Sequence, residues 1–262
     1  LSIQIASFFI SPNIAIGLDG RLAGLTGHPN TLGAISFCSI WASSSAILLL
    51  KPNKKLYLCL LISLVTLASS GSVTAMLVTA AAVASLILMK NKKRIKQKKV
   101  TAYALMSISP PIILWLMIKW EDLTGSFTSI TGKSSNFSGR TEIWATAHQL
   151  IKDRLILGWG FDDNALVISK TNFPYTSFHN GFLDIAVRGG LISFTLAIIF
   201  IFKFAKNSAR VKNTPLGTLA LSFLVAFTVH NISESSIFIH RNILWILMIF
   251  LFTCHWNKYW LL

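Results

Sequence analysis

Long runs of apolar residues, separated by short basic segments, constrain the fold of this chain more than any other feature of its sequence. A helix needs about 20 apolar residues to cross the ~30 Å hydrocarbon core of a bilayer, and several runs approach that length. Charged residues make up only 13% of the 262 residues, about half the share typical of a soluble domain. The sequence therefore predicts an all-α, polytopic transmembrane helix bundle, organised as a single integral membrane domain over residues 1–262.

Hydropathy gives seven candidate spans and one partial run. The candidates are residues 32–50, 56–70, 72–89, 100–120, 181–205, 215–230 and 242–260, and the partial run is 1–18. The chain opens on Leu1 inside that partial run, so we expect an N-terminally truncated form of a larger bundle. The three cysteines lie inside apolar runs without metal-ligand spacing, and we interpret them as small apolar fillers.

The basic residues are distributed unevenly between the loops. Fifteen of the 24 lie in loops that fall on one side when the spans alternate, and those loops contain no Asp or Glu. By the positive-inside rule this side is cytoplasmic, so the remaining loops face the opposite compartment. The net charge of +15 is therefore a signal of topology, and it does not indicate a nucleic-acid partner.

One loop on the non-cytoplasmic side, residues 121–180, is about 60 residues long, whereas most connections have only a few residues. Long loops carried by a rigid scaffold are where binding and catalysis concentrate. Apolar residues at helical spacing, with polar residues opposite, predict an amphipathic helix that ends near Gly158. Its apolar face is Ile143, Trp144, Ala147, Leu150 and Ile151, and its polar face is Thr141, Glu142, Gln149, Lys152 and Asp153.

Arg140 lies in the first turn of this predicted helix. A helix N-terminus already carries partial positive charge, so a cation there is unfavourable unless an anion joins it. Exposed backbone N–H groups together with a guanidinium form a site suited to phosphate. The alternative is structural: Arg140 pairs with Asp153 or Glu121 and ties the loop down.

His179 stands immediately before the candidate span that starts near Gly181. A helix N-terminus disfavours the imidazolium, so the ring is expected to be neutral near pH 7. A neutral imidazole can take a proton from a hydroxyl, which is the role of a general base. The alternative is an interfacial histidine that caps the helix together with Asn180.

Arg188 lies inside the apolar run, about 13 Å along the helix from His179. Asp184 precedes it by one turn, and an i,i+4 Asp–Arg pair would neutralise its charge in a bundle interior. The alternative is a second contact to an anion below the loop.

Asp162 and Asp163 resemble a metal site only superficially, because no nearby histidine or third carboxylate completes a ligand set. We therefore expect no metal and no cofactor. Three residues from other loops on the same side, Arg21, Glu234 and Arg241, are candidates to line the same cavity.

These segments together resemble a known family. They are RLAGLTGHPNTLG before a span, SGRTEIW opening the long loop, GWGFDD after its helix, SFHNGFLDIAVRGGLISF leading into the next span, and HNISES before the last span. Their order, spacing and sidedness are similar to those of the O-antigen ligase and O-antigen polymerase superfamily. The resemblance runs from about Arg21 to near the C-terminus.

The resemblance implies a metal-independent glycosyltransferase of the bacterial inner membrane. Such enzymes move a glycan from undecaprenyl diphosphate to a hydroxyl acceptor, either a glycan or lipid A-core, on the periplasmic side. It further implies that the donor diphosphate binds Arg140 and that His179 is the catalytic base. Membrane lipid is then a partner, and nucleic acid is not.

The sequence departs from the family pattern at Val73, where many relatives carry an arginine or a lysine. A second contact to phosphate would then come from Arg188, Arg241 or Arg21. With Asn180 and Glu234, these three residues complete the predicted substrate-binding set.

The acceptor stays open at this point, because a ligase, a polymerase and, ranked last, a protein-glycosylating relative of this superfamily share the donor chemistry. A transporter or flippase for a lipid-linked glycan is the alternative from another functional class. It predicts charged residues at mid-membrane and two related halves, whereas most charge here lies outside the spans or at their mouths.

Overall fold

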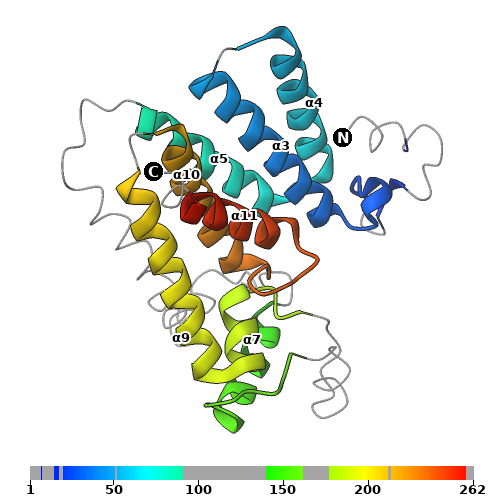
Figure 1. Cartoon of the computed structure of the whole chain (residues 1–262). Helices are drawn as coiled ribbons and strands as arrows, with labels where there is room; N and C mark the ends of the chain where they lie inside the picture. The colour runs from blue at the N-terminus through cyan, green and yellow to red at the C-terminus, as the bar shows by residue number, and fades with distance from the viewer. Residues whose placement is uncertain are drawn as a thin grey trace, which may run out of the picture. The chain divides into compact units, whose positions relative to one another are not determined.

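The computed structural model describes residues 7, 15–17, 20–50, 52–90, 140–161, 177–211 and 214–257. Every extended regular element in this described part is a helix, which confirms the predicted all-α class (Figure 1). The chain divides into two compact units. Unit 1 comprises Leu1–Lys99, Lys206–His230 and His240–Leu262, and unit 2 comprises Val100–Ala205 and Asn231–Ile239.

Unit 1 contains a helical hairpin and a third helix packed against it, α3 (Pro29–Leu49), α4 (Lys54–Ser70) and α5 (Val73–Lys90) (Figure 1). His28 is the N-cap of α3, and its Nδ1 accepts a hydrogen bond from the Asn30 amide at 3.1 Å. Gly71 ends α4 in the left-handed conformation, which glycine adopts without steric cost. Serines hold the hairpin together, with Ser39 Oγ 2.7 Å from Ser63 Oγ.

Two further helices belong wholly or mainly to unit 1, α10 (Pro215–Ser233) and α11 (Ile243–Asn257). Trp41 of α3 donates its indole N–H to Ser222 Oγ of α10 at 3.0 Å. The Trp41 ring also packs on Phe223, with ring centroids 5.1 Å apart. A buried indole is stable only when its N–H has a partner, so this contact fixes α3 against α10.

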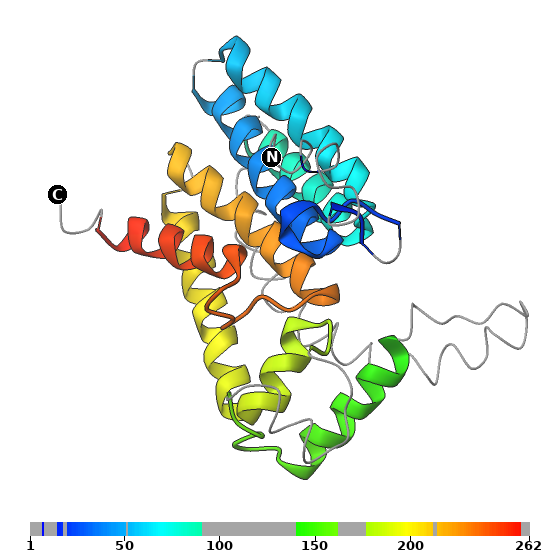
Figure 2. The same cartoon turned by 90° about the vertical axis from the view of Figure 1, so that its right-hand side faces the viewer.

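Unit 2 is built on α7 (Arg140–Asp153) and on the first part of α9 (Gly181–Arg210) (Figure 2). The predicted apolar face of α7 is confirmed, because Ile143, Ala147 and Leu150 are buried. They pack in one cluster with Phe178, Leu183 and Val187 from the start of α9 and the residues before it. The predicted polar face is exposed at Gln149, Lys152 and Asp153.

The long helix α9 is broken at Gly190, whose backbone has φ 61° and ψ −161°. The sequence predicted one continuous span here, so the break is a difference from expectation. Segment 155–160 supplies the hydrogen bonds that the break removes from the helix. Trp159 and Gly160 donate their amides to the carbonyls of Val187 and Arg188 at 2.9 and 2.8 Å.

Within the described part of the chain, four helices are long and apolar enough to cross a membrane, namely α3, α5, α9 and α10. The protein is therefore a multi-pass membrane protein. The apolar helices α4 and α11 have 17 and 15 residues and are shorter than these four. The candidate at 100–120 and most of the run at 1–18 lie outside the described residues, so the total of seven spans stays a prediction.

Candidate functional site

The sequence His179-Asn180-Gly181 forms the corner at which the long loop enters α9. Asn180 is fully buried and caps the helix, since its Oδ1 accepts hydrogen bonds from the amides of Phe182 and Leu183 at 3.0 and 3.1 Å. Asparagine is among the preferred N-cap residues because its short side chain reaches these amides. The corner therefore fixes where the helix starts and where the preceding histidine lies.

Gly181 joins this corner to the C-terminal end of α10. Its amide donates to the carbonyl of Glu234 at 3.2 Å, and Asn180 Nδ2 donates to the carbonyl of Ile232 at 3.0 Å. A Cβ atom at Gly181 would overlap Oδ1 of Asn231. The last carbonyls of a helix have no partners within that helix, and here the start of α9 supplies them.

Asn231 organises the turn that follows α10. Its side chain is fully buried, and its Oδ1 accepts hydrogen bonds from the amide and hydroxyl of Ser236, both at 2.9 Å, and from the amide of Ile237 at 3.2 Å. A single carbonyl oxygen thus holds both ends of the turn. This turn carries Glu234 and places it beside the corner before α9.

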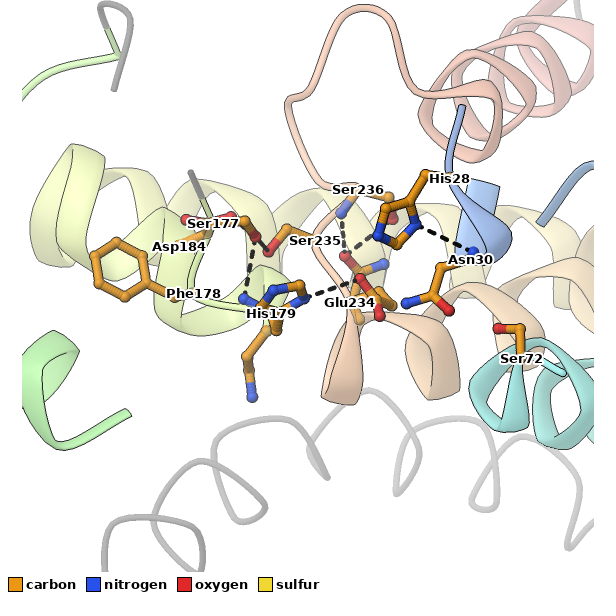
Figure 3. Close-up of polar contacts among 12 residues, drawn as sticks. His28, Asn30, Ser72, Ser177, Phe178, His179, Asp184, Glu234, Ser235 and Ser236 are labelled. Atoms are coloured by element: carbon orange, nitrogen blue, oxygen red, sulfur yellow. Dashed lines mark hydrogen bonds and ion pairs between the residues drawn. The ribbon is translucent and has the colours of Figure 1, made fainter. Parts of the chain in front are cut away.

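His179 lies at the centre of this arrangement (Figure 3). Its backbone has φ 49°, a conformation that few non-glycine residues adopt. The amide of His179 donates to Ser177 Oγ at 3.0 Å, and its Nδ1 lies 3.3 Å from Oε2 of Glu234. The histidine and glutamate side chains are 32% and 15% exposed, so a molecule from outside can reach the ring.

The contact with Glu234 determines what the imidazole can do. When Nδ1 donates its proton to a carboxylate, the lone pair of the neutral ring is on Nε2. The carboxylate also stabilises the positive charge that forms when Nε2 accepts a proton. Backbone strain of the kind seen at His179 is concentrated at functional sites, which supports a chemical role for this residue.

A second polar group lies one turn further along α9. Arg188 Nε is 3.5 Å from Oδ1 of Asp184, so the predicted i,i+4 ion pair is confirmed. Ser177 connects this ion pair to the corner at His179. Its Oγ accepts the hydrogen bond from the His179 amide and also lies 3.5 Å from Oδ2 of Asp184 and 3.1 Å from Oγ of Ser235 (Figure 3). The apolar run tolerates Arg188 because this charge is paired. An additional contact between Arg188 and an anion stays a prediction.

The other predicted site residues belong to other elements of the described part of the chain. Arg140 is the first residue of α7, as predicted. Arg21 belongs to unit 1, where its guanidinium donates to the carbonyl of Gly71 at 3.3 Å. Arg241 is exposed in unit 1, before α11. The exposed Val73 starts α5. The proposed roles of these residues stay predictions.

Among the described residues, no group of three or more His, Cys, Asp or Glu side chains could hold a metal ion. The two adjacent aspartates, Asp162 and Asp163, lie outside those residues.

Sequence reasoning grouped Glu234 with the site only as one of several residues on the same side. The direct contact with His179 joins residues 55 positions apart, and no local pattern indicates such a pair. The supporting roles of Ser177 and Asn231 were missed. The nearest signal was the segment HNISES, in which five of the six residues are polar at the end of the apolar stretch of α10.

Comparison with known proteins identifies a family. A family model described as O-Antigen ligase matches residues 58–198, which is more than half of the chain. The matched region includes α7 and the corner at His179, whereas Glu234 lies beyond its end. No curated protein matches the chain.

Proposed function

The chain belongs to the O-antigen ligase family, and on that premise we propose that it is a metal-independent, inverting glycosyltransferase. It moves a glycan from undecaprenyl diphosphate to a hydroxyl acceptor at the periplasmic face of the bacterial inner membrane. The observation that carries the proposal is the contact of 3.3 Å between His179 Nδ1 and Glu234 Oε2. It equips a partly exposed imidazole to act as a base.

The proposed reaction is a single displacement. Nε2 of His179 accepts the proton of the acceptor hydroxyl, and the acceptor oxygen forms a bond to the anomeric carbon of the donor sugar. The bond between that carbon and the phosphate oxygen breaks, and undecaprenyl diphosphate leaves with the electron pair. The attack comes from the face opposite the leaving group, so the anomeric configuration inverts.

Arg140 is proposed to bind the leaving diphosphate. It is the first residue of α7, where the backbone N–H groups of the first turn have no partners within the helix. Negative charge on the diphosphate grows as the sugar–phosphate bond breaks, so a guanidinium and a helix N-terminus bind the transition state more tightly than the ground state.

The proposal is tested with the purified full chain in proteoliposomes that contain an undecaprenyl diphosphate-linked glycan and lipid A-core. We expect glycosylated lipid A-core and free undecaprenyl diphosphate. Elongation of the lipid-linked glycan instead would identify a polymerase. Translocation of the donor without cleavage would contradict the proposal and support a flippase.

Replacing Arg140 by alanine is expected to lower the rate of transfer by at least about 10²-fold, because the main electrostatic contact to the leaving group is lost. Arg140→Lys should retain part of the activity, since lysine keeps the charge but lacks the planar fork. Lys152→Ala, on the exposed face of the same helix, is the control and should leave the rate unchanged. Equal rates for Arg140→Ala and Lys152→Ala would contradict the assignment.

Replacing Glu234 by glutamine is expected to lower kcat by about 10–100-fold, as for other groups that orient a reactive side chain. KM should change little, because the glutamate acts through His179. The double variant with His179→Asn should be no slower than His179→Asn alone, since residues acting as a unit are not additive. Asp153→Asn, at an exposed position of α7, is the charge-matched control. A full additive loss in the double variant would show that Glu234 acts independently of His179.

A further inference from the structure

We propose that the turn Leu155–Leu157, which follows α7, is inserted into the lipid bilayer beside the break in α9. The turn contacts lipid hydrocarbon in one leaflet of the bilayer, and the basic end of α9 lies at the surface of the other leaflet. The turn takes this position if α9 crosses a membrane with its basic end at one edge of the hydrocarbon core, whether or not the proposed transfer reaction is correct.

The turn exposes an unusual amount of apolar surface. Leu155, Ile156 and Leu157 are consecutive, and their side chains are 53%, 62% and 75% exposed. Phe161, which follows shortly after, is 52% exposed. Single exposed apolar residues are common on proteins, whereas a contiguous patch marks contact with another apolar phase.

Backbone hydrogen bonds hold the turn against the break in α9. The amides of Leu191 and Ile192, just after the break, donate to the carbonyls of Leu155 and Ile156 at 2.8 and 3.4 Å. Irregular backbone within a membrane is stable only where its polar groups are paired inside the protein. The segment that provides these partners must therefore lie at the same depth as the break.

Side-chain exposure along α9 changes at the break. Residues 181–187 are all buried, as are Gly189 and Gly190. Beyond the break, large apolar side chains are exposed at helical spacing, at Leu191, Ile192, Leu196, Ile199 and Phe202. In a helix that crosses a membrane, such a stripe faces lipid. The exposed side chains of the turn lie next to this stripe, because the backbone carbonyls of Leu155 and Ile156 accept hydrogen bonds from the amides of its first two residues.

The basic residues at the end of α9 set the depth of the turn. At ~1.5 Å per residue, the helix rises about 18 Å from Leu191 to Lys203 and about 28 Å from Leu191 to Arg210. The hydrocarbon core is ~30 Å thick, and these basic residues mark its cytoplasmic edge. The turn then lies about 2–12 Å inside the opposite edge, a depth that matches the insertion of interfacial segments.

The residues next to the turn suit the level of the lipid headgroups. The guanidinium of Arg154 lies over the ring of Trp159, 4.5 Å from its centroid. The indole N–H of Trp159 donates to the carbonyl of Leu150 at 2.9 Å. Tryptophan and arginine are both enriched where apolar and polar regions of a membrane meet. Arg154 is exposed and follows the polar end of α7, so it is placed to contact phosphate.

Site-specific photocrosslinking in proteoliposomes tests this inference. A benzophenone amino acid replaces Ile156 in the full chain, and adducts with the phospholipid are quantified by mass spectrometry. Leu196, exposed on the stripe of α9, is the positive control, and Asp153, exposed at the end of α7, is the negative control. We expect a lipid yield at position 156 close to that at 196 and several-fold above that at 153. The same label at Leu157 gives a second measurement of the lipid yield, in case the variant labelled at position 156 does not fold.

The other outcomes overturn the proposal. A lipid yield at positions 156 and 157 equal to that at 153 would place the turn in water. Crosslinks from 156 to another part of this chain or to a second copy would show that protein covers the turn. Neither outcome affects the transfer assay, so the two proposals fail separately.

Discussion

Replacing His179 by asparagine is expected to lower the rate of glycan transfer by about 10²–10⁴-fold, the usual contribution of a general base. Asparagine suits the test because it tolerates the positive φ of 49° at this position and has no basic nitrogen. The backbone corner before α9 should therefore stay intact while the proton acceptor is lost. The rate is measured with lipid-linked donor in proteoliposomes, on protein that elutes as the wild type does in size-exclusion chromatography.

His240→Ala is the matched control for this experiment, because His240 is exposed in unit 1. Its rate should equal that of the wild type. His179→Ala should lose at least as much activity as His179→Asn, and it should also be less stable because alanine is strained at positive φ. A wild-type rate for His179→Asn would refute the role of the imidazole as a base.

Replacing Gly158 by alanine is expected to destabilise unit 2 by more than about 4 kcal/mol, which is exceptional for a single substitution. Gly158 has φ +67°, and a Cβ atom there would overlap the carbonyl oxygen of Arg188 and lie 2.6 Å from the Gly190 amide nitrogen. Both are backbone atoms of the broken segment of α9, so no side chain can move aside. We expect little folded protein in detergent, measured by size-exclusion chromatography and thermal unfolding.

Gly160→Ala separates the two causes of that loss, which are the positive φ and the overlap of a Cβ atom with the backbone of α9. Gly160 also has a positive φ, +105°, but no atom lies within 4 Å of the position of its Cβ. Only the conformational strain remains, about 1–2 kcal/mol. If both variants lose the same stability, segment 155–160 does not approach α9 closely in solution, and the turn is not held at the depth of the break.

Local patterns predicted much of the fold. The amphipathic face of α7 followed from helical spacing within one segment, and the structure buries Ile143, Ala147 and Leu150 as expected. Helix ends were also predictable where a cap is encoded locally, as at Gly71 after α4. These features depend on residues close in sequence, which is the information that a single sequence contains.

Features that depend on distant residues were not predictable. Hydropathy is continuous through Gly189 and Gly190, so it gave no sign that segment 155–160 completes the backbone of α9. The pairing of His179 with Glu234 likewise depends on Asn231 and Gly181 bringing two helix ends together. The ion pair between Asp184 and Arg188 was predictable because one helical turn separates them.

The contact between Gly181 and Asn231 has a consequence for chimeric proteins. The two residues fit only as a pair, because any side chain at 181 would occupy the position of the Asn231 amide oxygen. A crossover between genes of diverged relatives that falls between these codons would exchange one partner without the other. Functional recombinants should therefore inherit segments 177–184 and 231–237 from the same parent, whatever the origin of the sequence between them.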